Sequence, residues 1–519
     1  MLNHATNLIQ TRCSHISGLD ITKTLMKRII EILIICCISF QFSYAQNFGN
    51  FPKIEKEKLL NDLEILYQGL DKFHSGMYWY TPKDSVDMAF QDVRKKITNA
   101  LNILEFHKLI APLVALSRED HTDITRPLIV QEKMNSEIRL LPLTVVFLGA
   151  KLYCVKNGSD FQDFTLEGKQ IESINGETPT SIVDKIGNLF ASDGFIKAVK
   201  YSDLKGFNFS TYYYYYFGQV DQFEIKFKDI KEPLIIKPLK TKVITQHLNL
   251  RYEGTKKTNN KEILEYKILN DSVAYIGIHT FDNDDIKRYS KEKKLSVFLK
   301  KSFKSIKENN IQTLVIDISK NGGGSEGNEG LVYSYFGENY QKYKKVRVKT
   351  QKAILDNGTD KPIKLKAFGL LERLFMNKKM KDGSLERKAS IGKGLMAYKK
   401  EPDYKFSGKT YVIISPVTYS GSSEFSNMMY TQDLATFVGQ ETGGGYLGNT
   451  SGYGNELVLP HSKIKVSIPS LQFVMNVKPT LPFGRGVIPQ YEVIPTFEEY
   501  INGENAPLKY ILEQLENEK

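Results

Sequence analysis

The chain has 519 residues, a formal net charge of +12 at pH 7 and four cysteines, and this length is ample for two or three domains. Only Cys154 follows the first 45 residues, so a mature chain would have no internal disulfide and must be stabilised by its core. No Cys/His cluster has the spacing of a zinc site, and no nucleic-acid motif accompanies the positive charge. We therefore expect no metal, no cofactor and no nucleic-acid partner.

The N-terminus has the features of an export signal. A charged start at Met26 is followed by an apolar run from Ile29 to Ile38, with small residues before a cleavage point after Ala45. The apolar run is too short for a comfortable membrane span, and no small residue precedes Cys36, which disfavours a lipoprotein. We expect residues 1–25 to be an over-extended gene start, a signal peptide from Met26 to Ala45, and an exported periplasmic or extracellular protein without stable membrane insertion.

Residues 50–130 predict an N-terminal helical domain. Leu59, Leu63, Leu66 and Leu70 recur every three or four residues and form a one-sided apolar stripe. This spacing is typical of helices that bury one face.

From residue 131 to 245 the pattern is that of a β-rich domain. Asn175 and Gly176 predict a tight hairpin turn, residues 180–189 predict a helix, and the tyrosine run 212–216 predicts a strand.

Residues 264–519 predict an α/β domain. A strand over 273–278, a helix over 297–308 and a strand over 313–318 form a β-α-β unit, and further strands are expected at 410–414 and 434–438. In such a domain the active-site loops lie at the strand ends.

Two loops of this domain carry candidate chemistry. Ser420 follows the strand 410–414 and precedes a helical run, so that its hydroxyl and the first helix amides can face the same point. Asn321 is followed by three glycines, which expose backbone N–H groups, and no Gly-Lys-Ser/Thr follows to make a nucleotide loop. Taken separately, the serine could be a helix N-cap and the glycines an ordinary turn.

Together these segments resemble the tail-specific (C-terminal processing) serine peptidases and their tricorn-core relatives. The resemblance rests on D-x-x-x-N-G-G-G from Asp317 and T-x-S-x-x-x-E from Thr418. Looser matches in the family's order are Arg118-Glu119-Asp120-His121-Thr122, Gly439-Gln440-Glu441-Thr442-Gly443-Gly444, Leu459-Pro460-His461-Ser462 and Gly486-Val487-Ile488-Pro489, with Gln490 in place of the usual Asp. The segment from Gly168 to Gly176 resembles a PDZ-type module.

The resemblance implies a multidomain α+β and α/β fold: a helical N-terminal segment, a PDZ-like β module over 131–245 and a ClpP/crotonase-like catalytic domain over 264–519. It implies an exported serine hydrolase that cleaves peptide bonds in peptide or protein substrates through an acyl-enzyme on Ser420. The oligomeric state is left open.

The family also suggests roles for individual residues. Gly322, Gly323, Gly324 and Gly421 would form the oxyanion hole. His121 matches the histidine that the tricorn-like branch uses as base, and His74 is the second choice. A lysine base is disfavoured, because Gly445 stands at its position.

The orienting acid has no clear match in this sequence. The glutamate usual before the last motif is missing, which leaves Glu441, or Glu119 and Asp120 beside the histidine, as candidates. The family's arginine in D-L-R-x-N is replaced by Ser319. These departures leave two alternatives open: a catalytically silent relative that binds peptides or small apolar ligands in the same groove, and an esterase. His121 could also be structural.

The positive charge is concentrated between residues 340 and 409. This segment has twenty Lys or Arg and seven Asp or Glu, an excess of thirteen. It is expected to be an insertion near the active site, either as a solvated lysine-rich face or as a lid that attracts anionic substrates.

Overall fold

The computed structural model describes residues 48–162, 165–253, 262–350, 352, 370–388, 396–398 and 400–518. The predicted signal peptide and parts of the basic segment lie outside these residues. Phe48–Lys519 form one compact unit. Among the helices of the described residues, none is both long enough and apolar enough to cross a bilayer.

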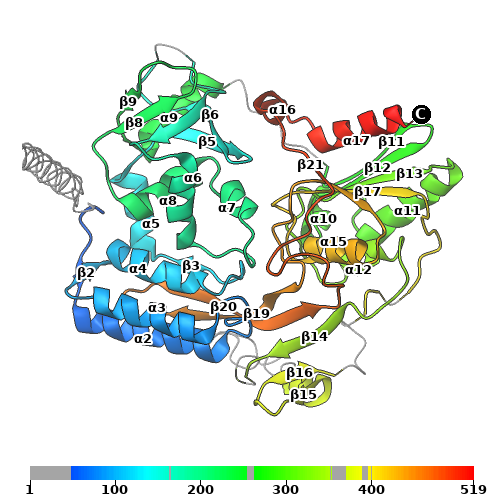
Figure 1. The fold of residues 1–519 in the computed structure, drawn as a ribbon, viewed down its shortest axis with the longest axis horizontal. Helices are drawn as coiled ribbons and strands as arrows, with labels where there is room; N and C mark the ends of the chain where they lie inside the picture. The colour runs from blue at the N-terminus through cyan, green and yellow to red at the C-terminus, as the bar shows by residue number, and fades with distance from the viewer. Residues whose placement is uncertain are drawn as a thin grey trace, which may run out of the picture. The chain divides into compact units, whose positions relative to one another are not determined.

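A six-stranded sheet forms the centre of the C-terminal part (Figure 1). In spatial order its strands are β11 (Leu264–Asn270), β12 (Val273–Ile278), β13 (Thr313–Asp317), β17 (Lys409–Ile414), β18 (Thr436–Gly439) and β21 (Tyr491–Glu492). β11 is antiparallel to β12, and all other pairs are parallel. Every residue of β12 and β13 is buried, as expected for parallel strands covered on both faces.

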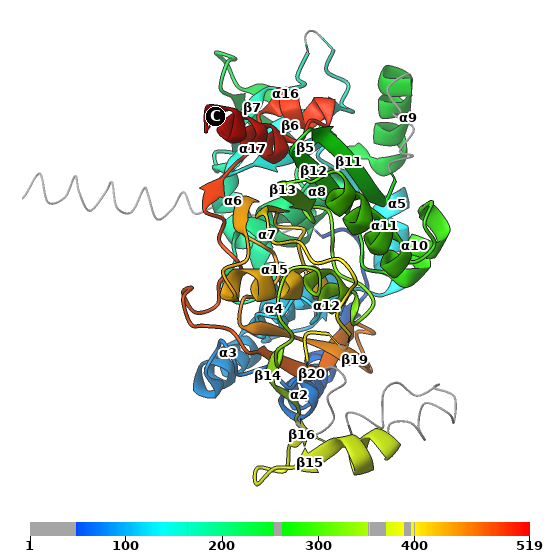
Figure 2. The same ribbon diagram turned by 90° about the vertical axis from the view of Figure 1, so that its right-hand side faces the viewer.

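Helices cover the two faces of this sheet (Figures 1 and 2). On one face Ile316 and Val412 pack with side chains from α10 (Asn283–Tyr289), α11 (Leu295–Glu308), α12 (Asn328–Tyr333) and α15 (Gly421–Thr431). On the other face Val315 and Ile413 pack against Ile511 of α17 (Ala506–Asn517), which follows α16 (Phe497–Asn502). The strands and the helix predicted here lie within two residues of their observed bounds.

A second sheet joins segments that are distant in the sequence. It has the order β15-β16-β14-β20-β19, and β3 pairs with β20. Its strands are β3 (Ile124–Thr125), β14 (Tyr343–Val348), β15 (Asn377–Lys379), β16 (Leu385–Arg387), β19 (Gly448–Val458) and β20 (Lys465–Met475), with a short π-helical segment Glu372–Met376 before β15. The basic segment 340–409 therefore contributes three strands to a sheet.

Five helices from the first half of the chain share one hydrophobic core with residues of β20, and α2 contacts the second sheet directly. They are α2 (Lys56–Phe73), α3 (Lys83–Lys96), α4 (Ile103–Ala115), α5 (Leu128–Ser136) and α9 (Thr241–Tyr252), with the short strands β1 (Lys53–Ile54) and β2 (Leu101–Asn102). The leucine stripe of α2, from Leu59 to Leu70, is buried in one core with Ile468 of β20. An amphipathic helix thus buries its apolar face, as its spacing predicts.

A third sheet is antiparallel, with the order β5-β6-β7-β8-β9. It consists of β5 (Leu143–Leu148), β6 (Lys151–Asn157), β7 (Gln170–Ile174), β8 (Phe223–Phe227) and β9 (Leu234–Ile236), accompanied by α6 (Pro179–Ile186), η1 (Gly187–Leu189), α7 (Ala198–Asp203) and α8 (Phe207–Phe217). A further pair is β4 (Arg139–Leu140) with β10 (Leu239–Lys240). Asn175 and Gly176 form the predicted turn, with φ of 50° and 78°.

The strand predicted for residues 212–216 is wrong, because these tyrosines lie in α8. The helix lets neighbouring rings reach different cores: Tyr213 packs in the core of the third sheet, and Tyr214 and Tyr215 pack in the core of the N-terminal helices. A tyrosine run has high β propensity, but packing on both sides decides its conformation.

Candidate active site

The carboxyl ends of β13, β17 and β18 bring three loops to one edge of the parallel sheet. These loops are residues 318–324, 415–420 and 440–445. Hydrogen bonds fix them to one another: Thr418 Oγ1 donates to Ile318 O, Ser422 Oγ donates to Asn321 O, and Gly444 N donates to Thr418 O. Loops at the carboxyl edge of a parallel sheet are the usual place for a site.

Ser420 stands at a sharp turn directly before α15. Its φ of 49° and ψ of −125° lie in a region that non-glycine residues rarely adopt. The side chain is half-buried, and its Oγ makes no hydrogen bond in the described part of the chain. A strained turn at a helix N-terminus presents a serine hydroxyl to an approaching carbonyl.

The glycine loop packs directly against this serine. A Cβ built on Gly323 would lie 2.7 Å from Ser420 Cβ and 3.0 Å from Gly421 N, so a side chain there would displace the turn. Gly323 also has a φ of 100°, which favours glycine. Glycine at this position is required for the close approach of the two loops.

The structure corrects one expected oxyanion donor. Gly323 N donates to Asn321 Oδ1 at 2.8 Å, so that this N–H is not available to a substrate in this conformation. The N–H groups of Gly322, Gly324 and Gly421 make no hydrogen bond within the described residues. Gly421 opens α15, where the helix dipole favours negative charge.

His121 lies on the loop between α4 and β3, in the N-terminal region of the chain. After α4 the chain turns at Arg118, whose φ is 51°, and enters β3, which pairs with β20 through Ile124 and Thr125. His121 Nδ1 is buried without a hydrogen-bond partner, and burial lowers the pKa of the ring. The imidazole is therefore neutral at pH 7.

Asp193 ties the histidine loop to the serine loops. Its carboxylate accepts hydrogen bonds from Asp120 N at 2.9 Å and from Gly445 N at 3.1 Å. Gly445 follows Gly444, where an added Cβ would lie 3.3 Å from Ser420 N. One carboxylate thus binds the residue before His121 and a residue of the loop that packs on Ser420. His121 and Ser420 make no direct hydrogen bond with each other in the described structure.

Two buried carboxyl groups, Glu119 and Asp193, and the half-buried Asp120 lie around this connection. Burial raises the pKa of Asp193 to about 6. Burial and Asp193 raise the pKa of Asp120 to about 7 and the pKa of Glu119 well above its usual range. Burial raises the pKa of Tyr419 well above its usual range, and the charges of Asp193 and Asp120 raise it further.

The other proposed site residues are held by other partners. Glu119 accepts from Thr450 N and Thr450 Oγ1 at 2.8 and 2.9 Å. Glu441 forms a two-pronged ion pair with Arg485 Nε and Nη2 at 2.7 and 2.6 Å. Neither carboxylate hydrogen bonds His121 in the described structure.

His74, the second candidate base, is fully buried. Its Nε2 lies 2.7 Å from Thr122 Oγ1, and its Nδ1 accepts from Gly76 N at 3.1 Å. Burial and the charge of Lys349 lower its pKa to about 3. His74 is a neutral anchor for the segment that follows His121.

Beneath the serine helix lies a buried ionic cluster that the sequence did not reveal. Lys342 Nζ donates to Glu329 Oε1 at 2.5 Å and to Glu424 Oε2 at 3.2 Å, and Tyr343 OH donates to Glu424 Oε2 at 2.5 Å. Lys342 is only 2% exposed. Burial acts to lower the pKa of Lys342, but Glu329, Tyr343 and Glu424 together raise it well above its usual range.

This cluster packs directly against the start of α15, where the candidate oxyanion donor Gly421 lies. A Cβ on Gly421 would lie 3.8 Å from Glu329 Oε2, and Glu424 is one turn after Ser420 on α15. Lys342 belongs to the basic segment, so at this position the expected solvated face is wrong. Removing one member of such a buried cluster leaves an uncompensated charge in the interior.

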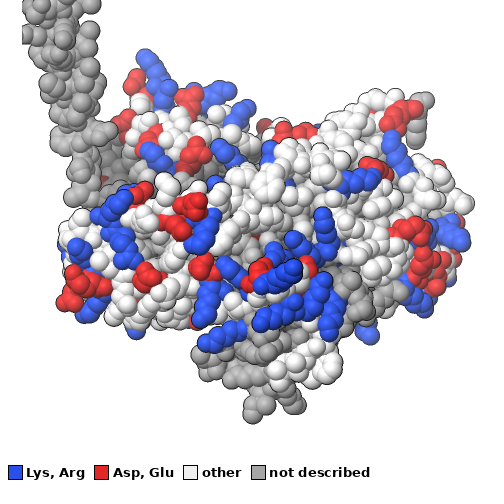
Figure 3. Space-filling view, turned by 60° about the horizontal axis from the view of Figure 1, so that its bottom comes forward, with Lys and Arg blue, Asp and Glu red and all other residues white. Residues whose placement is uncertain are grey.

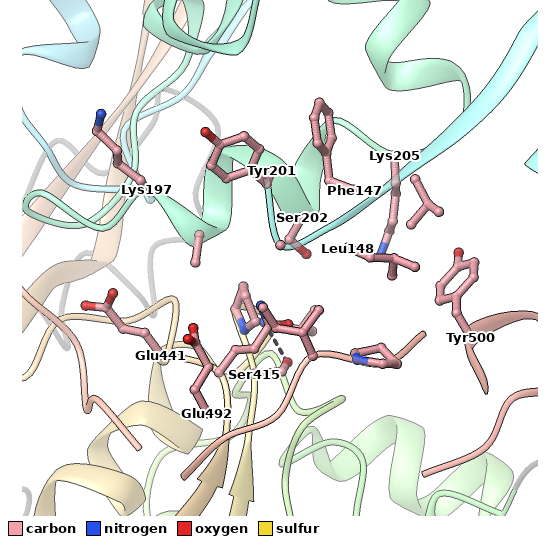
Figure 4. A pocket seen from close by; sticks show the side chains of 18 of the residues that line it. Phe147, Leu148, Lys197, Tyr201, Ser202, Lys205, Ser415, Glu441, Glu492 and Tyr500 are labelled. Atoms are coloured by element: carbon pink, nitrogen blue, oxygen red, sulfur yellow. Dashed lines mark hydrogen bonds between the residues drawn. The ribbon is translucent and has the colours of Figure 1, made fainter. Parts of the chain in front are cut away.

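A cavity of about 610 Å³ opens beside the loop that leads to Ser420 (Figure 4). Figure 4 shows Tyr201 and Ser202 on one side and Ser415, Glu441 and Glu492 on the other. Residues 146–149 at the end of β5, an edge strand of the third sheet, also line it. A volume of this size suits a ligand of several residues.

A serine at a strand–turn–helix, a glycine loop against it and free helix amides are typical of a serine hydrolase. Residues 272–492 match the family model of peptidase family S41. These residues therefore form a domain of this family of tail-specific, serine-type peptidases.

Solved structures share the fold. Mature CPAF is 14% identical, with a TM-score of 0.54 over 86% of this chain and 94% of that one. Mature CPAF complexed with lactacystin is 14% identical, with a TM-score of 0.56 over 89% of this chain and 99% of that one. No curated protein matches the sequence.

The pKa of Asp193 predicts how stability depends on pH. A carboxyl group whose pKa is higher in the folded state binds its proton more tightly there, which stabilises the folded state at low pH. This contribution to the free energy of unfolding is lost as the pH rises from about 4, the usual pKa of Asp, through about 6, the pKa in the folded protein. Asp193→Asn removes this titration. Between pH 4 and pH 7 the variant should gain roughly 2 kcal/mol of unfolding free energy relative to the wild type. Denaturant unfolding at several pH values measures the difference.

Asp221→Asn is the matched control, because Asp221 is exposed. The difference in unfolding free energy between Asp221→Asn and the wild type should not change between about pH 4 and pH 7. A flat difference for Asp193→Asn would contradict the prediction.

Proposed function

We propose that this protein is exported and cleaves peptide bonds through an acyl-enzyme on Ser420. The observation that carries the proposal is the strained Ser420 turn, packed on Gly323 and followed by the free N–H of Gly421. Family membership supports peptide or protein substrates. Export rests on the signal-like segment ending at Ala45, so a protein purified from the exporting cell should begin at Gln46 by mass spectrometry; a retained segment would contradict export.

In the proposed reaction, Ser420 Oγ attacks the carbonyl carbon while His121 takes the hydroxyl proton. The carbonyl oxygen becomes an oxyanion and accepts hydrogen bonds from Gly421 N–H and from a glycine-loop N–H at Gly324 or Gly322. Losing one such donor typically costs on the order of a hundredfold or more in rate. Collapse of the intermediate breaks the C–N bond, the leaving amine takes the proton, and water then hydrolyses the ester by the same route.

His121 is suited to this role by its neutral state. Burial lowers its pKa, so the imidazole is free to accept a proton at pH 7. Its loop is positioned by the pairing of β3 with β20 and by the hydrogen bond from Asp120 N to Asp193. These contacts position the backbone of the loop that carries His121, whereas no carboxylate hydrogen bonds the imidazole ring in the described residues.

The cavity beside Ser415 offers space for a substrate next to the serine loop. β5 is an edge strand whose Val145 O accepts from Gly206 N, while residues 146–148 face the cavity. An extended peptide can add to such an edge through its backbone. This arrangement supports the PDZ-like role inferred for the module, with Lys197 and Lys205 placed to attract a carboxylate.

A second candidate function is ligand binding without catalysis. It is favoured by one observation: Glu119 and Glu441 are both committed to other partners, and no carboxylate hydrogen bonds His121 in the described residues. A silent relative would bind peptides in the cavity without cleaving them.

Replacing the nucleophile separates the two functions. Ser420→Ala should lower kcat/KM for peptide hydrolysis by roughly 10⁴-fold or more, because the attacking oxygen is lost. A fluorophosphonate probe should label Ser420 in the wild type and nothing in the variant, as read by peptide mass spectrometry. Ser426→Ala, about one and a half turns further along α15, removes a hydroxyl that donates to Ser422 O but should keep activity. Absence of both label and turnover in the wild type would establish the silent alternative.

Replacing the histidine tests the base. Wild-type kcat/KM should rise with pH as His121 loses its proton, with a midpoint below the usual value of about 6.5, and be flat above pH 7. His121→Ala should lower kcat/KM by roughly 10² to 10⁴-fold and lose this step. His247→Gln, on α9, should leave the pH profile unchanged. Full activity of His121→Ala would exclude His121 as the base.

A further inference from the structure

A second cavity, of about 540 Å³, shares no lining residue with the cavity beside Ser415. It is formed where the segment after α2 meets the face of the second sheet. Its lining comprises His74, Ser75, Tyr78, Trp79, Lys345, Arg347, Val348, Lys349, Asp382, Ser384, Gln472 and Val474. No catalytic role proposed above uses this cavity.

The cavity is cationic because of one strand. Lys345, Arg347 and Lys349 are alternate residues of β14 and its continuation, and Asp382 is the one acidic residue of the lining. Arg347 pairs with Asp382 at 2.9 Å, and Lys349 Nζ lies 3.8 Å from Asp71 Oδ1. Lys345 has no ion-pair partner within the described residues, so it is the cation left for a ligand carboxylate. Lys and Arg side chains gather near the middle of the face that Figure 3 brings forward, which is the face with β14 and β16 at the bottom of Figure 1.

The spacing of these cations suits an extended peptide. Alternate residues of a strand lie about 6.7 Å apart and point to the same side. Lys345 and Arg347 pair across the sheet with Val474 and Gln472, which line the same cavity. Alternate side chains of an extended peptide lying along β14 repeat at the same distance, so acidic residues at alternate positions would meet successive cations.

Aromatic side chains also line the cavity. Lys349 Nζ lies 4.8 Å from the centre of the Tyr78 ring, and Trp79 is half-buried and stacks on Tyr80 with ring centres 5.2 Å apart. Lys349 N donates to Ser75 Oγ at 3.0 Å, which fixes the end of β14 to the segment that carries these rings. An occupant of the cavity would therefore meet both cations and aromatic rings.

The cavity also borders the histidine loop. His74 forms part of its lining, and His74 Nε2 lies 2.7 Å from Thr122 Oγ1, the residue after His121. A chain bound here would therefore lie against the same loop as the proposed base.

We propose that this cavity binds an extended acidic segment of a protein substrate, with Asp or Glu at alternate positions. That the occupant is a substrate rests on the proposed peptidase function; the binding itself does not. The site would retain acidic proteins near the catalytic loops without taking part in bond cleavage.

Trp79 gives a direct readout, because it is the single tryptophan of the chain. The experiment titrates Ser420→Ala protein with a tryptophan-free decapeptide carrying three glutamates at alternate positions and follows Trp79 fluorescence. A peptide of the same composition with the three glutamates adjacent is the matched ligand. We expect a saturable change for the alternate peptide, weaker binding of the adjacent one, and weakening of both as salt rises.

Two substitutions on the same strand test the residues. Lys345→Ala should weaken binding of the alternate peptide about five- to tenfold. Lys344→Ala should change it less than about twofold, because Lys344 is exposed and does not line the cavity. Equal loss in both variants, equal affinity for both peptides, or an equal fluorescence response to short-chain polyphosphate would overturn the proposal.

The outcome is separable from that of the proposed function. If Ser420→Ala protein binds the alternate peptide while the wild type is neither labelled nor active, the acidic-segment site stands and the peptidase proposal fails. If the wild type is active and no fluorescence change occurs, the acidic-segment site fails and the peptidase proposal stands.

Discussion

The parallel pairing of β13, β17 and β18 is the constraint on which the site depends. In this pairing Asp317 lies beside Ile413, and Ile414 lies beside Gly439. Parallel strands leave the sheet at the same edge, so the glycine loop, the serine loop and the loop after β18 must converge there. The apolar residues that bury these strands therefore also determine where polar chemistry can be assembled.

Convergence of three loops leaves little room for side chains. Added Cβ atoms would lie 2.7 Å from Ser420 Cβ at Gly323 and 2.2 Å from Ser423 Oγ at Gly444. Backbone therefore approaches backbone, and the N–H groups of Gly322, Gly324 and Gly421 have no hydrogen-bond partner among the described residues. The buried cluster of Lys342, Glu329 and Glu424 then fixes α12 and α15 to each other from below.

The histidine loop is attached to this edge by a different kind of contact. Asp193, which lies between η1 and α7, bonds the loop before His121 and the loop after Gly444 with one carboxylate. The adjacent backbone repeats the connection, since Gly194 N donates to Arg118 O and Phe195 N donates to Gly484 O. A segment of the third-sheet region thus holds together parts of the site that no strand pairing connects. Displacement of this segment would separate the histidine loop from the serine loop.

The sequence by itself determined those local elements that show a regular apolar spacing or a characteristic turn sequence. The leucines of α2, the apolar strands β12 and β13, the Asn175-Gly176 turn and the serine before α15 all follow from spacing and turn chemistry. Even the glycine loop and the peptidase family that residues 272–492 match could be identified from short motifs. The tyrosines 212–216 could not, because packing against two cores outweighs β propensity.

Only the tertiary structure decided which charged groups serve the site. Lys342 is one of many lysines in a basic segment, and nothing in its neighbours indicates burial against Glu329 and Glu424. Asp193 stands in a short polar turn, and its partners are 73 and 252 residues away. The partner of a charged side chain depends on long-range packing, which a local pattern does not encode. Glu441, by contrast, had a motif but is held by Arg485, because a two-pronged ion pair was within its reach in the folded chain.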